Sequence, residues 1–426
     1  MLIEFQVSNF RSFRERQTLS MTAGNLSDHL ESNTFDSGVA GLPRLVRSSA
    51  LYGPNAAGKT NLLRALGFVQ AMVLHSAKAT GDAITNYSPF KLDTASRNSP
   101  SEFKITFVQN RLRYEYGLSV GSTRVCREWL VEYVHPRGRT LFDRRYNDKK
   151  DTYDWQLSTF LKGTKEVWKD TTRPNALFLS IATQLNSRQL LPIFEWFQKR
   201  LVVIVDVTTM NAALTLNLLR DPEGKKRLLP FLREADSSIA DVDAQREAVP
   251  LGSSLVVAGP GDHIVESRPG NEAPNLWRIT LSHRGGANGS EMFGSSLNEE
   301  SGGTQFLFQT AGAWLNVLTN GEVLCFDEVD RSLHPILVAF LLRRFHSNRH
   351  NPSNAQIIFT THNTSLLRPQ TDLLRRDQVW FVERGQNNGS ALYPLTDFKP
   401  RNDAALEDGY LRGRYGALPL FPNLVE

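Results

Sequence analysis

The chain has 426 residues, of which 40% are hydrophobic and 22% charged, so it can bury a core large enough for two or three domains. Its net charge of +5 permits contact with nucleic acid without indicating it. Two distant cysteines, Cys126 and Cys325, argue against a disulfide framework or a zinc site. The apolar runs are too short for a membrane span, and the N-terminus lacks a signal-peptide pattern. We therefore expect a cytoplasmic protein.

The first third of the chain shows strand patterns around one long helix. Residues 2–13 alternate apolar and polar side chains and predict a strand or hairpin. A buried strand is expected at 45–53, followed by a helix over 61–77. Turn signals separate three strand-like runs between 102 and 146, which predicts antiparallel hairpins.

The remainder is mainly helical first and then alternates strands with helices. Short strands are expected from 237 to 284, and helix, strand, helix and strand follow at 305–319, 322–326, 335–345 and 356–360. Such alternation favours a mostly parallel sheet. We therefore expect an α/β fold with a mixed sheet, an antiparallel β subdomain and a helical insertion. The expected segments are 1–150, 151–236 and 237–426.

The stretch GPNAAGKT, residues 53–60, matches the pattern GxxxxGK[ST] and lies between a predicted strand and a predicted helix. Its glycines allow the backbone to wrap phosphate oxygens, and the helix N-terminus favours their charge. Lys59 is expected to reach the β- and γ-phosphates, and Thr60 to ligate Mg²⁺. The alternative is an accidental glycine-rich turn. The expected nucleotide-binding residues here are Gly53, Pro54, Asn55, Ala56, Ala57, Gly58, Lys59, Thr60 and Asn61.

Two further strands end in polar side chains suited to phosphate chemistry. EVLCFDE places Asp327 and Glu328 at the end of a strand, next to a phosphate loop on the neighbouring strand. Asp327 is expected to hold Mg²⁺, and Glu328 to activate the attacking water. His362 follows the strand IIFTT and is expected to sense the γ-phosphate. Taken alone, the acidic pair fits a solvated turn, and the histidine fits a structural role.

The segment Ser301-Gly302-Gly303-Thr304 directly precedes the helix predicted at 305–319. Its last residue lies 23 residues before Asp327. A serine and glycines at a helix N-terminus form an anion site. Because the chain already has a phosphate loop, a second such site is most useful for capping a nucleotide held by another copy. A surface loop is the alternative.

The order of these motifs resembles the ATP-binding-cassette ATPases, especially the branch with SMC proteins, RecF and the OLD nucleases. ESGGT stands where that family has LSGGQ, so Thr304 replaces the glutamine. The resemblance implies ATP and Mg²⁺ as ligands and a head-to-tail pair of chains, with a larger ring left open. It implies that Asp330 of the D-loop DEVDRSLHP reaches across the pair. Arg11 and Ser12, in VSNFRSF, would lie near adenine and phosphates, with a strand edge as the alternative.

The stretches DRSLHP, TTHNTSLL and GYLRGRYGALP are similar to ATPases of bacterial anti-phage systems, such as the RloA-type proteins and the ATPase subunit of the PARIS system. Such proteins work with a separately encoded effector, often a Toprim-type nuclease. Since no Toprim-like acidic cluster follows His362, nuclease activity is expected from a partner encoded nearby. Arg412 and Arg414 fit either a partner contact or an ordinary tail.

The sequence is compatible with three functions, and its short insertion, modest charge and C-terminal resemblance favour the first of them. The first is an ATPase switch that controls an effector. The second is a DNA-binding repair ATPase, and the third is a scaffold that binds ATP and hardly hydrolyses it. The segment 111–150 holds ten Lys or Arg against five Asp or Glu, which suits DNA phosphates or a solvated sheet face. Glu328 argues against the scaffold.

Overall fold

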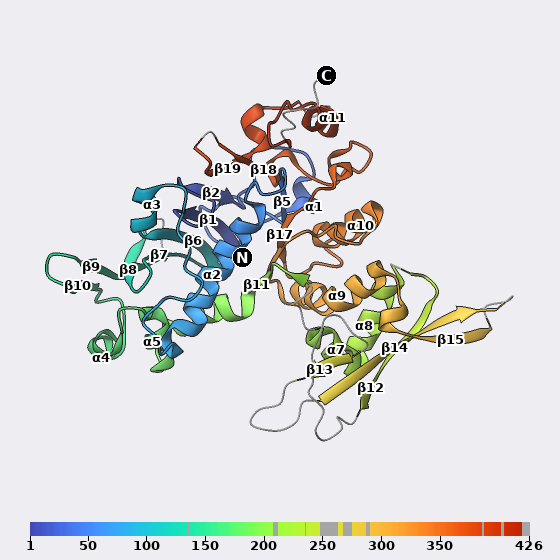
Figure 1. Cartoon of the computed structure of the whole chain (residues 1–426), viewed down its shortest axis with the longest axis horizontal. Helices are drawn as coiled ribbons and strands as arrows, with labels where there is room; N and C mark the ends of the chain where they lie inside the picture. Colours follow the sequence, from blue (N-terminus) through green and yellow to red (C-terminus); the bar gives the residue numbers. More distant parts are fainter. Residues whose placement is uncertain are drawn as a thin grey trace. The chain divides into compact units, whose positions relative to one another are not determined.

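The computed structural model describes residues 1–134, 137–207, 212–234, 236–247, 263–266, 275–286, 290–385, 387–401 and 404–419 (Figure 1). The chain divides into two compact units. The first unit comprises Met1–Val205, Gly321–Val329 and Leu342–Glu426, and the second comprises Asp206–Asn320 and Asp330–Leu341. These boundaries differ from the segments expected at 1–150, 151–236 and 237–426, because the chain leaves the first unit and re-enters it twice. Among the described residues, none of the helices has the length and hydrophobicity that a membrane span requires.

A six-stranded sheet lies at the centre of the first unit. Its order is β11 (Leu201–Ile204), β16 (Val323–Phe326), β17 (Gln356–Thr360), β5 (Ser48–Tyr52), β18 (Val379–Arg384) and β19 (Ser390–Pro394). The first five strands are parallel and β19 is antiparallel, so the sheet is mixed as predicted. Every residue of β5, β16 and β17 is buried, as is typical of parallel strands covered on both faces. The helix α2 (Lys59–His75) follows β5.

The first unit also contains a seven-stranded antiparallel sheet, which confirms the predicted β subdomain. Its order is β10 (Thr152–Leu157), β9 (Arg139–Asn147), β8 (Val125–Tyr133), β7 (Leu112–Val120), β6 (Ser101–Gln109), β1 (Leu2–Ser8) and β2 (Gln17–Ser20). One buried apolar cluster joins this sheet, α2 and the six-stranded sheet. Within it, the rings of Phe107 and Trp196 stack with centroids 4.3 Å apart.

Shorter elements complete the first unit. They are α1 (Leu30–Asn33), β3 (Thr34–Phe35), β4 (Leu45–Val46), η1 (Ser76–Lys78), α3 (Thr94–Asn98), α4 (Lys165–Thr171), α5 (Phe178–Gln184), α6 (Leu191–Glu195), the π-helix η2 (Trp196–Arg200), η5 (Thr364–Leu367), η6 (Arg376–Gln378), η7 (Leu395–Phe398) and α11 (Leu406–Leu411). The helix α10 (Pro335–His346) begins in the second unit and ends in the first.

The second unit pairs helices with a small antiparallel sheet. The sheet contains β12 (Ile239–Glu247), β14 (Asn275–Gly285), β13 (His263–Glu266) and β15 (Glu291–Ser296), and β14 pairs with each of the other three. The helices are α7 (Ala213–Arg220), α8 (Pro222–Arg233), the short η4 (Leu297–Glu299) and α9 (Gly302–Asn320). The α7 and α9 backbones approach closely at Gly312, where a Cβ would lie 2.3 Å from the Thr215 amide nitrogen.

A buried ion pair fastens α5 to the antiparallel sheet. The side chains of Glu128 and Arg144 are both fully buried and lie 3.9 Å apart. Glu128 accepts hydrogen bonds from the first two amides of α5, at Phe178 (2.7 Å) and Leu179 (3.0 Å). Burial raises the pKa of Glu128, and the Arg144 guanidinium opposes that shift. Glu128 therefore compensates both a cation and a helix N-terminus in the core.

Replacing Glu128 with alanine is expected to destabilise the first unit by about 3–5 kcal/mol, since it leaves Arg144 buried without its counter-charge. Urea unfolding of the variant and the wild type measures the change. Glu166→Ala is the matched control, because Glu166 forms an exposed pair with Lys169 on α4 and should leave the urea midpoint unchanged. Equal midpoints for Glu128→Ala and the wild type would contradict this role.

Candidate nucleotide site

The predicted site residues of the first unit follow three adjacent parallel strands. The phosphate loop 53–60 follows β5, His362 follows β17, and Asp327 with Glu328 follows β16. Parallel strands present their carboxyl ends at one sheet edge, so these residues gather there. The strand β17 lies between β5 and β16. The expectation that the acidic strand directly neighbours the phosphate-loop strand was therefore wrong, because the histidine strand occupies that position.

The backbone of the phosphate loop requires glycine at two positions. Gly53 has φ +147°, and a Cβ there would lie 2.1 Å from the Val382 carbonyl oxygen. Gly58 has φ +116°, and a Cβ there would lie 2.3 Å from Ser390 Oγ. Both conformations are ones that L side chains rarely adopt. Neighbouring strands β18 and β19 thus press against a loop whose path only glycine permits.

The Lys59 ammonium lies inside the phosphate loop. Lys59 is buried, and its Nζ donates to the carbonyl oxygens of Gly53 (2.7 Å) and Pro54 (3.1 Å). Lys59 is also the first residue of α2, so Thr60 and Asn61 follow in the first helical turn, where the amides favour an anion. Two loop carbonyls thus accept hydrogen bonds from the ammonium that is expected to bind phosphate.

Ser12 contacts the phosphate loop from the N-terminal segment. Its Oγ accepts a hydrogen bond from Asn61 Nδ2 (2.9 Å), and its carbonyl oxygen accepts one from the Ser390 amide (2.7 Å). Arg11 has φ +53°, its amide donates to the Ser88 carbonyl oxygen, and its guanidinium lies 5.7 Å from the Phe10 ring centroid. Burial lowers the Arg11 pKa, and the Arg64 charge adds to that shift. The structure places Ser12 at the loop; contact of either residue with nucleotide stays a prediction.

One threonine joins the two acidic residues. Thr360 Oγ1 donates to Asp327 Oδ1 (2.6 Å) and accepts from the Glu328 amide (2.7 Å). Asp327 is buried, whereas Glu328 is exposed and has φ +52°. Left-handed backbone at a non-glycine residue is uncommon in proteins overall, and the cases that occur are concentrated at functional sites. The two carboxylates therefore differ in environment: one is fixed in place and one is open to solvent.

His362 lies two residues beyond the end of β17 and is exposed. The preceding Thr361 is buried, and its amide donates to the Leu51 carbonyl oxygen of β5 (3.2 Å). The histidine therefore follows a backbone that is hydrogen-bonded directly to the strand before the phosphate loop.

The donors at this edge fit a magnesium ion that arrives with a nucleotide. Among the residues that the structure describes, no group of three or more His, Cys, Asp or Glu side chains is placed to hold a metal. Mg²⁺ in nucleotide sites commonly takes one or two protein oxygens and completes its shell with phosphate oxygens and water. The Thr60 hydroxyl and the Asp327 carboxylate are protein oxygens of that kind.

The predicted signature loop and Asp330 of the D-loop belong to the second unit. Ser301 caps α9, because its Oγ accepts from the Thr304 amide (3.2 Å) and lies 3.0 Å from Thr304 Oγ1. Thr304 is buried, so its hydroxyl serves the loop itself, whereas Ser301 and Gly302 are exposed. A Cβ on Gly303 would lie 3.1 Å from the Ser332 carbonyl oxygen. The loop therefore abuts the segment that begins at Asp330.

Sequence reasoning missed Thr360 and Ser390. Thr360 had a local signal, as a polar residue that ends the apolar run before His362. Ser390 had none, because its contact with the phosphate loop, from Oγ to the Ala57 carbonyl oxygen, joins residues far apart in sequence.

Part of the positive charge of the segment 111–150 is paired with carboxylates of the same segment. Arg127 and Arg145 both pair with Asp143, at 2.8 and 2.9 Å, and Arg139 pairs with Glu132 at 2.6 Å. At these three arginines, the pairs favour the solvated sheet face over the phosphate-binding surface.

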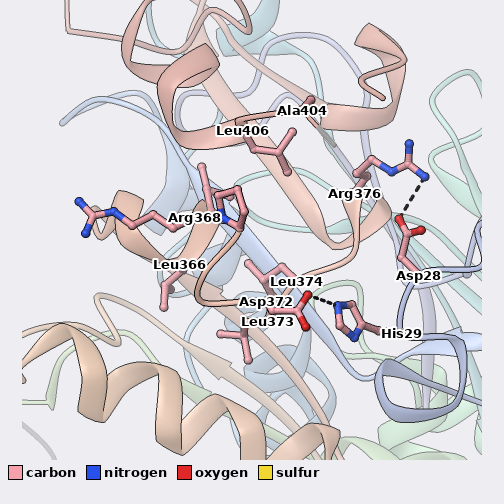
Figure 2. A pocket seen from close by; sticks show the side chains of 12 residues that line it. Asp28, His29, Leu366, Arg368, Asp372, Leu373, Leu374, Arg376, Ala404 and Leu406 are labelled. Atoms are coloured by element: carbon pink, nitrogen blue, oxygen red, sulfur yellow. Dashed lines mark hydrogen bonds and ion pairs between the residues drawn. The ribbon is translucent and has the colours of Figure 1, made fainter. Parts of the chain in front are cut away.

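A separate cavity of about 280 Å³ lies between the N-terminal segment and residues 366–406 (Figure 2). Its charged groups pair with one another: Arg376 lies 3.0 Å from Asp28, and His29 lies 2.9 Å from Asp372. Arg368 pairs with Glu407 at 2.6 Å. Because both arginines already have counter-charges, the cavity lacks the excess positive charge that suits a polyphosphate.

A family model described as "AAA domain, putative AbiEii toxin, Type IV TA system" matches residues 48–368, well over half of the chain. The chain belongs to this family. The match spans the phosphate loop, the acidic strand and His362, so these motifs lie within the ATPase domain that defines the AAA_21 family.

Solved structures similar to this AAA_21 chain include heads of SMC proteins. An SMC head bound to the C-winged helix domain of ScpA has 13% identity and a TM-score of 0.44, with 96% of this chain and 99% of that chain covered. The SMC head domain from Thermotoga maritima has 14% identity and a TM-score of 0.36, with 92% and 98% covered. A search of curated proteins returned no match.

Proposed function

We propose that the chain is an ATPase that binds ATP and Mg²⁺ at the phosphate loop and hydrolyses the γ-phosphate bond. The carrying observation is the Thr360 bridge, which sets a fixed Asp327 and an open Glu328 at the same sheet edge as the loop. In this proposal Lys59 binds the β- and γ-phosphates, and Thr60 and Asp327 hold the metal. Glu328 takes the proton of the attacking water, and His362 senses the γ-phosphate.

We further propose that hydrolysis requires two copies of the chain. Ser301–Thr304 and Asp330 of one copy would cap the nucleotide on the phosphate loop of the other. The exposed Ser301 and Gly302 at the N-terminus of a 19-residue helix support this, because they present a helix dipole and a hydroxyl to an anion. A head-to-tail dimer is the smallest assembly that completes such a site, and a closed ring of more copies also satisfies it.

A mixture of two inactive variants tests the shared site. Ser301→Arg is expected to retain ATP binding by the monomer and to lose ATP-driven association, because a bulky cation then occupies the capping loop. Lys59→Ala loses nucleotide binding but keeps an intact capping loop. Mixing the two chains should restore up to about a quarter of the wild-type turnover per site under random pairing. Turnover no greater than the sum of the separate variants would argue against sharing between chains.

For the biological role, we propose a switch subunit of an anti-phage system that controls a separately encoded effector, with a Toprim-type nuclease as the expected class. The family description, which names a putative toxin of a toxin–antitoxin system, supports a defence role. The narrower likeness to RloA-type ATPases and the PARIS ATPase subunit belongs to this proposal. Co-purification with the product of the neighbouring reading frame, with and without ATP, is the test. Binding that does not change with ATP would contradict the switch.

The alternative is a DNA-binding repair ATPase in which ATP clamps the dimer on DNA. The ion pairs of Arg127, Arg139 and Arg145 count against the segment 111–150 as its DNA surface. Tight, ATP-dependent and salt-sensitive binding to duplex DNA would favour this alternative over the switch.

A further inference from the structure

Glu300, the residue directly before Ser301, is held by side chains of the second unit. Its side chain is 7% exposed, so a charged carboxylate there needs hydrogen-bond donors. His283 Nε2 lies 2.8 Å from Glu300 Oε1, and the Ser295 hydroxyl donates to the same oxygen. Since a carboxylate only accepts, Nε2 of His283 carries the hydrogen.

His283 is itself fixed from its other side. It lies on β14, where it pairs with Ile239 of β12 and with Phe293 of β15. Its Nδ1 lies 2.8 Å from Ser238 Oγ and 3.8 Å from an Asp236 carboxylate oxygen. The imidazole therefore bridges the segment before β12 and the segment before α9.

The hydrogen bonds continue from Glu300 into the capping loop. Gln305 Nε2, in the first turn of α9, donates to the Glu300 carbonyl oxygen (2.9 Å), and the Gln305 amide donates to the Ser301 carbonyl oxygen (2.9 Å). Ser301 then caps the helix through the Thr304 amide. Hydrogen bonds thus connect His283 on β14 to Glu300, Glu300 to Gln305, and the first turn of α9 to the Ser301 hydroxyl.

We propose that His283 is a positioning residue, which sets the orientation of Ser301 through Glu300 for contact with the nucleotide of a second copy. This inference rests on the proposed function, because Ser301 needs a defined orientation only if it caps a nucleotide. Without His283, the nearly buried Glu300 carboxylate loses one of its donors and turns toward water. The backbone at Ser301 then shifts, and misplacement on the order of 1 Å lowers turnover.

A double-mutant cycle tests the coupling. His283→Ala and Glu300→Ala are each expected to lower turnover at saturating ATP by roughly 10- to 100-fold, while ATP binding by the monomer stays within about twofold of wild type. The double variant should be no more than about twofold worse than either single variant, since both changes break one link. His283→Gln should recover most turnover, because its amide donates from nearly the position of Nε2. Arg284→Ala, an exposed neighbour on the same strand, is the matched control.

The outcomes separate this inference from the proposed function. If the wild type turns over ATP and Lys59→Ala does not, but His283→Ala equals the wild type, only the positioning role fails. Independent, multiplying losses in the double variant, or no recovery by His283→Gln, also overturn it. A lower melting temperature with lost ATP binding in His283→Ala would show a merely structural role. If the wild type has no turnover above that of Lys59→Ala, the proposed function itself fails.

Discussion

Replacing Glu328 with glutamine is expected to slow ATP hydrolysis by about 10²- to 10⁴-fold, because the amide cannot accept the proton of the attacking water. ATP binding should persist, since the Lys59 contacts and the phosphate loop are unchanged. The variant should therefore accumulate in the ATP-bound, associated state. Phosphate release measures the first effect, and light scattering with ATP measures the second.

Glu322→Gln is the control for this experiment. Glu322 directly precedes β16, at the opposite end of that strand from Glu328, and should leave turnover near that of the wild type. Unchanged turnover in Glu328→Gln would remove Glu328 from the catalytic role. Loss of ATP binding in the same variant would indicate that the substitution distorts the backbone at residue 328, which has a left-handed conformation.

Replacing Lys59 with alanine is expected to weaken ATP binding by about 100-fold or more, as loss of a charge-assisted contact worth about 3 kcal/mol implies. The buried ammonium contacts carbonyl oxygens of the phosphate loop itself. Its removal is therefore expected to act on this loop and not on other parts of the first unit. Titration with a fluorescent ATP analogue measures the change.

Lys91→Ala provides the matched comparison, because Lys91 is an exposed lysine of the first unit. It should bind the analogue as the wild type does. Wild-type affinity in Lys59→Ala would show that the loop is not the nucleotide site. Equal losses in both variants would indicate a general effect of charge.

The acidic residues show why part of the site was readable from sequence. Asp327, Glu328 and His362 each follow a contiguous apolar run, and a parallel strand delivers whatever follows it to one sheet edge. Their meeting at one sheet edge could therefore be predicted from local sequence pattern alone. The position of β17 between β5 and β16 did not, because strand order is decided by how helices and loops pack across the sheet.

Thr304 shows the opposite case. In the sequence, Thr304 stands where the resembling family has glutamine, and the contacts of the threonine side chain could not be predicted. In the structure it is buried and holds the Ser301 hydroxyl, so the loop is capped within itself. The bond from His283 to Glu300 was equally invisible, since it links side chains 17 residues apart in the chain.

The sequence by itself determined the local chemistry of this protein: a phosphate loop between a strand and a helix, a carboxylate pair after an apolar strand, and a serine with glycines at a helix start. These depend on neighbours within about ten residues and on backbone periodicity. Only the tertiary structure decided the strand order, the Thr360 bridge, the packing of Ser12 and Ser390 on the loop, and the anchoring of Glu300. Those contacts join distant segments, and their geometry follows from packing of the whole core.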